Sequence, residues 1–139
     1  MQRIDKKKIE GMSIPPESTI RQAMVVIGRG EIGTAFIVEA QTKRFLGLIT
    51  DGDIRRAILK GGNLEDKIQL IERPATKTAS VGMKVEEIAK MFGEKIRVIP
   101  VLDLEKRIVD IALYDQRFRL PVAEPILGET LLVTILPVH

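Results

Sequence analysis

Four consecutive residues, Thr50 to Asp53, place a hydroxyl, two carboxylates and a glycine at one point of the chain. The apolar residues before them, 45–49, are typical of a buried strand, and the residues after them are typical of a helix. Thr50 and Asp53 have the spacing of a capping box, in which each side chain accepts a hydrogen bond from a free backbone N–H group. Gly52 costs about 1 kcal/mol relative to alanine in a helix, which indicates a close approach at this residue.

Two interpretations of this strand-to-helix junction stay open on local grounds. A simple helix cap explains Thr50 and Asp53 without any ligand. Alternatively, the exposed N–H groups at such a junction suit an anionic or hydroxyl-bearing ligand, and Gly52 would let it approach the backbone. The residues therefore predict either a cap or a ligand pocket.

The elements that position the junction occur twice along the chain. Apolar residues at 20, 23, 24 and 27 share one face of a predicted helix, and residues 85, 88, 89 and 92 form the corresponding face in the second half. In both halves a short leading strand precedes this helix, and two further strands and a helix follow it. The predicted ranges in the two halves are 12–14 and 78–81, 35–38 and 99–102, 45–49 and 108–113, and 53–60 and 114–119.

This repeat predicts an α/β fold made of two pseudo-symmetric β-α-β-β-α repeats. Each half is too small to bury both faces of its sheet, so we expect the two halves to pack on each other. The expected parts are a basic N-terminal segment (1–9), repeat 1 (10–63), a linker (64–76), repeat 2 (77–118) and a C-terminal tail (119–139).

The composition excludes several classes of function. Among 139 residues there is no cysteine, which excludes disulfides, thiol nucleophiles and cysteine-based zinc sites and agrees with a cytoplasmic location. The one histidine, His139, is too isolated for a catalytic triad or a metal site, so we predict no enzyme and no metal. A net charge of +3 and a single tyrosine argue against nucleic-acid binding, and the longest apolar runs are too interrupted for a membrane span.

Residues 24–35 contain a glycine pattern that resembles a dinucleotide-binding fingerprint, Gly28-x-Gly30-x-x-Gly33. It would make the chain a small Rossmann-type fragment that binds NAD. However, the apolar residues before it have helical spacing, and the β-branched residues 34–38 after it favour a strand. We therefore prefer a glycine-rich helix end followed by a loop.

Over about residues 10–118 the chain resembles a tandem pair of CBS domains, also called a Bateman module and named after cystathionine β-synthase. The residues Gly47 to Asp53 match that family's pattern Gly-x-hydrophobic-Thr/Ser-x-x-Asp in full. The resemblance implies a regulatory module that needs no cofactor and binds AMP, ADP, ATP, NAD or S-adenosylmethionine between its repeats. It also implies that Thr50 contacts phosphate or ribose and that Asp53 accepts hydrogen bonds from ribose hydroxyls.

The residues that this resemblance assigns to the ligand come from both halves. Ile99, Pro100 and Val101 match a hydrophobic-Pro-Val motif at the mouth of such clefts, although a buried strand explains them equally well. The predicted ligand-binding set is Gly47, Ile49, Thr50, Asp51, Gly52, Asp53, Val98, Ile99 and Pro100.

The second repeat departs from the family pattern at the corresponding junction. Alignment places Asp110 at the glycine, Leu113 at the threonine and Gln116 at the final aspartate, unless Asp115 substitutes after a shift of one residue. We therefore expect one intact site and one degenerate site.

Two further resemblances suggest nucleotide-sugar metabolism as the context. Residues 48–57 are most similar to CBS pairs attached to sugar-phosphate nucleotidyltransferases, and residues 120–129 are faintly similar to the start of sugar aminotransferases. An apolar terminal strand at 131–136 is the alternative for the tail.

The resemblance to CBS pairs also implies partners. It implies a homodimer, with the helix faces 20/23/24/27 and 85/88/89/92 as its interface, and a catalytic partner domain or protein. A ligand-free structural dimerisation domain remains a further alternative.

Overall fold

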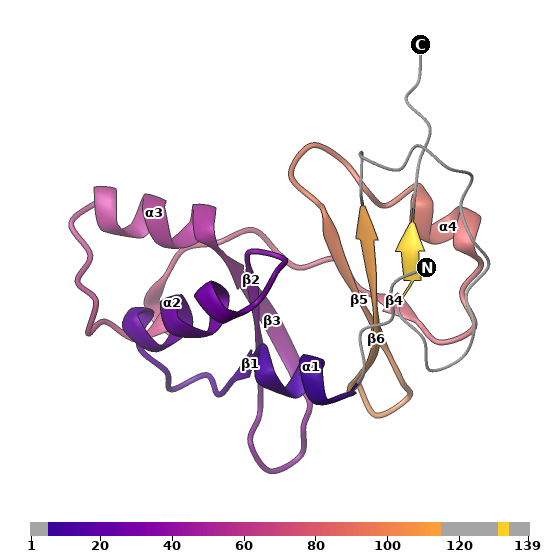
Figure 1. The fold of residues 1–139 in the computed structure, drawn as a ribbon, viewed down its shortest axis with the longest axis horizontal. Helices are drawn as coiled ribbons and strands as arrows, with labels where there is room; N and C mark the ends of the chain where they lie inside the picture. The colour runs from indigo at the N-terminus through magenta and orange to yellow at the C-terminus, as the bar shows by residue number, and fades with distance from the viewer. Residues whose placement is uncertain (1–5, 115–130, 134–139) are drawn as a thin grey trace. The chain divides into compact units, whose positions relative to one another are not determined.

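The computed structural model describes residues 6–114 and 131–133, which form two compact units (Figure 1). One unit spans residues 8–76, and the chain enters the other at Lys77. The first elements are α1 (Lys6–Gly11), β1 (Ser13–Ile14), α2 (Ile20–Arg29), β2 (Thr34–Val38), β3 (Phe45–Thr50), α3 (Asp51–Leu59) and the 3-10 turn η1 (Ile68–Leu70). The later elements are β4 (Ala79–Ser80), α4 (Val85–Ala89), β5 (Val98–Leu102), β6 (Ile108–Tyr114) and β7 (Leu131–Val133).

Each unit contains one sheet with the same strand directions. In the first unit β1 pairs in parallel with β2, and β2 pairs antiparallel with β3. The second unit repeats this arrangement with β4, β5 and β6, and adds β7 in parallel beside β6. The predicted α/β fold of two related repeats is therefore confirmed.

The strand registers confirm the predicted alignment of the two halves. Gly47 pairs with Ile37, and Asp110 pairs with Val101, the equivalent residue of the second sheet. Both hairpins shift register directly after these pairs, and Thr50 and Leu113 likewise occupy equivalent pairs. The predicted second helix of repeat 2 differs, because Tyr114 still belongs to β6 and residues 115–119 lie outside the described part of the chain.

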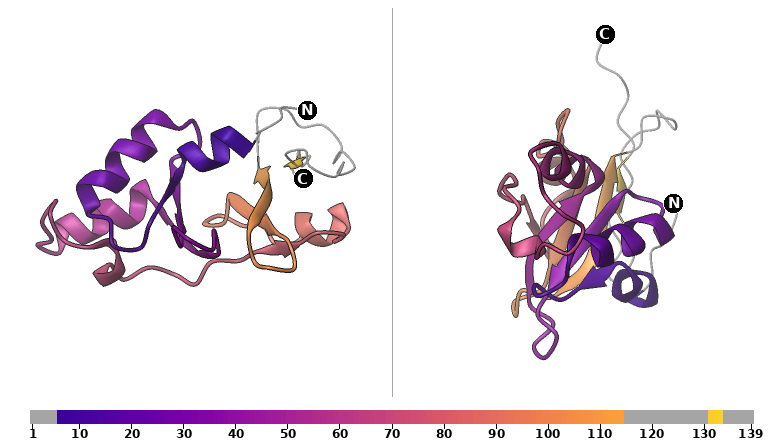
Figure 2. Two further views of the ribbon diagram at one scale, coloured as in Figure 1. Left: turned by 90° about the horizontal axis from the view of Figure 1, so that it is seen from below. Right: turned by 90° about the vertical axis from the view of Figure 1, so that its left-hand side faces the viewer.

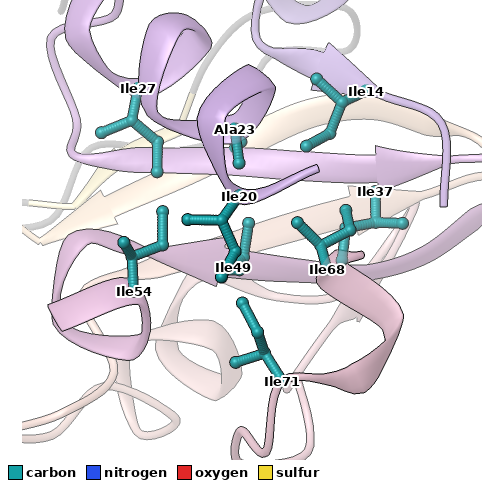
Figure 3. Close-up of a cluster of buried hydrophobic side chains, with 10 residues drawn as sticks. Ile14, Ile20, Ala23, Ile27, Ile37, Ile49, Ile54, Ile68 and Ile71 are labelled. Carbon is teal, nitrogen blue, oxygen red and sulfur yellow. The ribbon is translucent and has the colours of Figure 1, made fainter. Parts of the chain in front are cut away.

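The core of the first unit lies between its sheet and the helices α2 and α3 (Figures 2 and 3). Ile20, Ala23 and Ile27 from α2 point into it, whereas Met24 is 46% exposed. The apolar face predicted for dimer contacts is therefore mostly used for the core, and the same holds for Val85 and Ile88 in the second unit. The buried residues of the first core are Ile14, Ile20, Ala23, Ile27, Ala35, Ile37, Ile49, Ile54, Ile68 and Ile71.

The segment after α3, which was predicted to be a linker, packs against α2 and the core of the first unit. The backbone N–H of Ile20 donates to the carbonyl of Asp66 (2.9 Å), and that of Ile68 donates to the carbonyl of Ser18 (2.9 Å). Ile68 and Ile71 then complete the apolar core, as Figure 3 shows. The residues just after Ile71 are consequently held close to the first sheet.

Candidate functional site

The junction between β3 and α3 is a reciprocal capping box. Thr50 has the extended backbone of an N-cap residue, and its Oγ1 accepts a hydrogen bond from the Asp53 N–H (3.2 Å). The Thr50 N–H in turn donates to Oδ2 of Asp53 (2.9 Å). Two of the backbone N–H groups at this helix start are thereby satisfied. The cap that the sequence predicts is present, and it uses the same two residues as the predicted ligand site.

Asp53 is a buried acid that forms one ion pair among the described residues. The residue is 3% exposed, and its Oδ1 accepts a hydrogen bond from Nη2 of Arg56 at 2.6 Å. Arg56 lies one turn further along α3, and its side chain is 61% exposed. An ionised carboxylate offers about four acceptor positions, so the two bonds at Asp53 leave acceptor capacity for further hydroxyl groups.

Gly52 lies close to the Arg56 guanidinium. A Cβ built at residue 52 would lie only 3.2 Å from Nη1 of Arg56 and 3.7 Å from Oγ1 of Thr50. The close approach that the sequence predicts at Gly52 is therefore that of an arginine side chain. Arg56 is not among the residues predicted for the site, although its (i, i+3) spacing from Asp53 is the signal for such a pair.

Gly47 also has a close neighbour, which comes from a distant part of the sequence. Its φ of +155° is strained for other residues, and a Cβ built there would lie 3.1 Å from Nη2 of Arg73. Thr76 lies beside this arginine, and its Oγ1 accepts a hydrogen bond from the Leu48 N–H (3.2 Å). Arg73 and Thr76 are thus two polar residues at the predicted site that sequence reasoning missed.

The remaining predicted residues have different surroundings. Ile49 is fully buried in the core and supports the end of β3. Asp51 is exposed, and its Oδ2 lies 3.4 Å from the position of a Cβ at Gly33. Val98, Ile99 and Pro100 begin β5 of the other unit, where Ile99 and Pro100 are buried.

The corresponding junction of the second repeat lacks the same chemistry. Leu113 stands where Thr50 stands in the first repeat, so no hydroxyl is available at this position. The Tyr114 ring instead contacts the Phe92 ring (centroids 5.8 Å apart) and the Arg97 guanidinium (4.3 Å). Gln116 and Asp115 lie outside the described residues.

The glycine pattern at 28–33 does not form a dinucleotide-binding turn. Gly28 lies in the last turn of α2, Gly30 is the residue that caps that helix, and Gly33 leads into β2. A dinucleotide fingerprint needs a strand before the glycines and a helix after them, and here the order is reversed. The alternative of a Rossmann-type fragment is therefore wrong, and the helix end with a loop is confirmed.

Neither metal chemistry nor a membrane span has structural support in the described residues. Residues 6–114 and 131–133 contain no group of three or more histidine, cysteine, aspartate or glutamate side chains that would hold a metal ion. In the same ranges no helix is long and apolar enough to cross a bilayer.

Comparisons with known proteins support the fold and its family. The family model of the CBS domain matches residues 7–60, which include the whole β3–α3 junction. The solved CBS domain protein PAE2072 from Pyrobaculum aerophilum, complexed with AMP, is 22% identical, with a TM-score of 0.63 over 75% of this chain and 84% of that chain. The CBS domain pair of protein MJ0100, complexed with 5′-methylthioadenosine and S-adenosyl-L-methionine, is 25% identical, with a TM-score of 0.62 over 73% and 80% of the two chains. These matches support a CBS domain pair.

The curated proteins that this chain matches are longer than the chain. Uncharacterized proteins from two Helicobacter pylori strains, J99 and 26695, are 23% and 22% identical over 100 residues. The match covers 70% of this chain and 30% of each relative. The chain thus corresponds to about a third of the length of these relatives.

The two capping boxes of the first unit allow the structural role of Thr50 to be measured. Thr19 and Gln22 form the same reciprocal box at the start of α2 that Thr50 and Asp53 form at α3. Thr50→Ala and Thr19→Ala should each lower the free energy of unfolding by about 1 kcal/mol, because each leaves one N–H without its cap. Urea denaturation followed by circular dichroism measures both, and Thr50→Ser should retain wild-type stability. A Thr50→Ala variant as stable as the wild type would show that the box contributes nothing.

Proposed function

We propose that this chain is a regulatory module that binds an adenosine nucleotide at the β3–α3 junction. The observation that carries the proposal is the buried Asp53 carboxylate, held beside the Thr50 hydroxyl at the start of a helix. The AMP found in the related Pyrobaculum aerophilum protein and the adenosine compounds found with MJ0100 support the ligand class. The ligand is AMP, ADP, ATP, NAD or S-adenosylmethionine, and no further cofactor is required.

Each part of the proposed site has a chemical role. The free acceptor positions of Asp53 suit the vicinal hydroxyls of a ribose, since an ionised carboxylate only accepts hydrogen bonds. Thr50 and the N-terminal N–H groups of α3 suit an oxygen of ribose or phosphate, because this helix end carries partial positive charge. Gly47 and Gly52 give the guanidinium groups of Arg73 and Arg56 room beside the backbone, and the buried Ile49 anchors the end of β3 in the core. The other predicted residues, Val98, Ile99 and Pro100, begin β5 of the second repeat; Ile99 and Pro100 are buried there, so only Val98 of these three offers side-chain surface to a ligand.

The proposed mechanism is regulatory and not catalytic. We infer repeats at 10–63 and 77–118, with the nucleotide bound at the β3–α3 junction of the first repeat. A ligand that binds one arrangement of the repeats more tightly shifts the population toward that arrangement, and a partner domain or protein responds to the shift. The similarity of residues 48–57 to CBS pairs of sugar-phosphate nucleotidyltransferases favours a catalytic partner in nucleotide-sugar metabolism.

Nucleotide binding can be separated from helix capping by matched variants. Asp53 and Gln22 hold the same position in the two capping boxes, but only Asp53 belongs to the proposed site. Asp53→Ala should lower the affinity for the best nucleotide at least about tenfold, because hydrogen bonds to a charged acceptor are lost. Gln22→Ala should leave that affinity unchanged.

The ligand is chosen first by a thermal-shift panel of AMP, ATP, NAD and S-adenosylmethionine on the wild-type chain, since a ligand of the native state raises Tm. Isothermal titration calorimetry then gives the affinities of the variants. An equal loss in Asp53→Ala and Gln22→Ala would assign the effect to capping, and the absence of binding by every compound would favour a ligand-free structural domain.

We also propose a homodimer that uses the outer surface of α2 and α3, which lie side by side (Figure 1). Since Ile20, Ala23 and Ile27 are needed for the core, the contact must use other residues. The large apolar side chains exposed on these helices are Met24, Val25, Ile58 and Leu59.

A pair of charged substitutions tests this dimer. The Met24→Glu and Leu59→Glu double variant should sediment as a monomer at micromolar concentration, because burial of two carboxylates in an apolar contact is unfavourable. Leu104→Glu is the control, since Leu104 is 97% exposed in the β5–β6 turn and belongs to neither helix. Sedimentation velocity distinguishes the species. A monomeric wild type, or a double variant that stays dimeric, would contradict the proposed contact.

A further inference from the structure

Arg73 is a cation beside Gly47 of the predicted site, and it forms no ion pair with the described residues. It is partly buried, and its Nη2 lies 3.1 Å from the position of a Cβ at Gly47. Within the part of the chain that the structure describes, no carboxylate forms an ion pair with Arg73. By contrast, Arg21 pairs with Glu65 and Arg56 pairs with Asp53. A guanidinium that is partly buried and has no ion pair among these residues favours the binding of an anion.

Thr76 adds a second donor at the same place. Its Oγ1 lies 3.7 Å from the position of a Cβ at Gly47 and accepts a hydrogen bond from the Leu48 N–H. A hydroxyl that accepts one bond still has its own proton to donate. A guanidinium fork and a hydroxyl donor together match the oxygen atoms of a phosphate group, which are acceptors only.

The core of the unit holds both residues in position before any ligand binds. Ile68 and Ile71, just before Arg73 in the chain, are buried with Ile49 from β3, and the Thr76–Leu48 hydrogen bond attaches the segment on the other side of Arg73. Gly47 is the residue that permits the approach, because a side chain there would meet the guanidinium. An arginine fixed in this way loses less freedom when it binds a ligand than one on a free loop would.

We propose that Arg73 and Thr76 recognise a phosphate group of the ligand at the β3–α3 junction. This inference rests on the proposed nucleotide site and narrows it to a ligand class. The site selects adenine nucleotides that carry a phosphate over adenosine derivatives without one, such as 5′-methylthioadenosine. Arg73 is then a specificity-determining residue, and Asp53 holds the part of the ligand that both classes share.

Two probes that differ in the phosphate test this assignment. AMP and adenosine share base and ribose, so calorimetric titration of the wild-type chain with each isolates the phosphate contribution. AMP should bind at least about tenfold more tightly than adenosine, because a charge-assisted contact is gained. Arg73→Gln should remove most of this difference by weakening AMP binding while adenosine affinity stays the same, and Arg73→Lys should keep part of it.

Arg44→Gln is the matched control, since it removes one positive charge from an exposed residue at the end of the β2–β3 turn. It should leave the AMP affinity unchanged, and thermal melts confirm that each variant is folded. Equal affinity of the wild type for AMP and adenosine, or an Arg73→Gln variant with unaltered AMP affinity, would overturn the phosphate assignment while the nucleotide site stands. A wild-type chain that binds neither compound would overturn the nucleotide site, and the phosphate assignment with it.

Discussion

The candidate site depends on one buried carboxylate at the end of a strand. Asp53 is held by the Thr50 N–H on one oxygen and by Arg56 on the other, while its own N–H is bonded to Thr50. An ionised group in this position must be hydrogen-bonded to be tolerated, and the capping box meets that requirement without consuming all of its acceptor positions. A carboxylate that is buried, oriented and only partly saturated is well prepared to bind hydroxyl groups.

The surrounding residues support this carboxylate in two ways. Ile49 and Ile54 anchor the end of β3 and the start of α3 in the isoleucine-rich core. Two glycines let arginine side chains approach the backbone, Gly52 for Arg56 and Gly47 for Arg73. Within residues 6–114 and 131–133 only the first of these arginines is paired with an acid. Residues 47–53 therefore carry an acceptor for hydroxyl groups at one end and, at the other, a neighbouring cation that has no ion pair in those ranges.

The second repeat shows which features belong to the fold and which belong to the site. Its sheet repeats the register and the bulge of the first sheet, so the backbone geometry does not depend on the capping residues. With Leu113 in place of Thr50, the fold is kept but the hydroxyl is lost. The second junction is thus a natural comparison within the same chain.

Local features were predictable from the sequence, and contacts between distant segments were not. The Thr50–Asp53 box was predictable because both partners lie within one helical turn, and the repeat because apolar periodicity reports helices and strands directly. Arg73 was missed because it follows Gly47 by a whole helix and a turn, and only the packing of Ile68 and Ile71 brings it back. Tyr114 was expected to start a helix, but it pairs with Val133, and no local pattern reports such a distant partner.

The most direct test of the account is a titration of the isotope-labelled chain with AMP, followed by amide NMR. The account predicts saturable shifts at Gly47 to Asp53, with an apparent affinity equal to the calorimetric value. It also predicts that Asp53→Ala removes these shifts, because the proposed acceptor for the ribose hydroxyls is lost. Shifts at Gly47 to Asp53 that persist unchanged in Asp53→Ala, or a wild-type chain without any shift there, would contradict the central claim that the first junction is the nucleotide site.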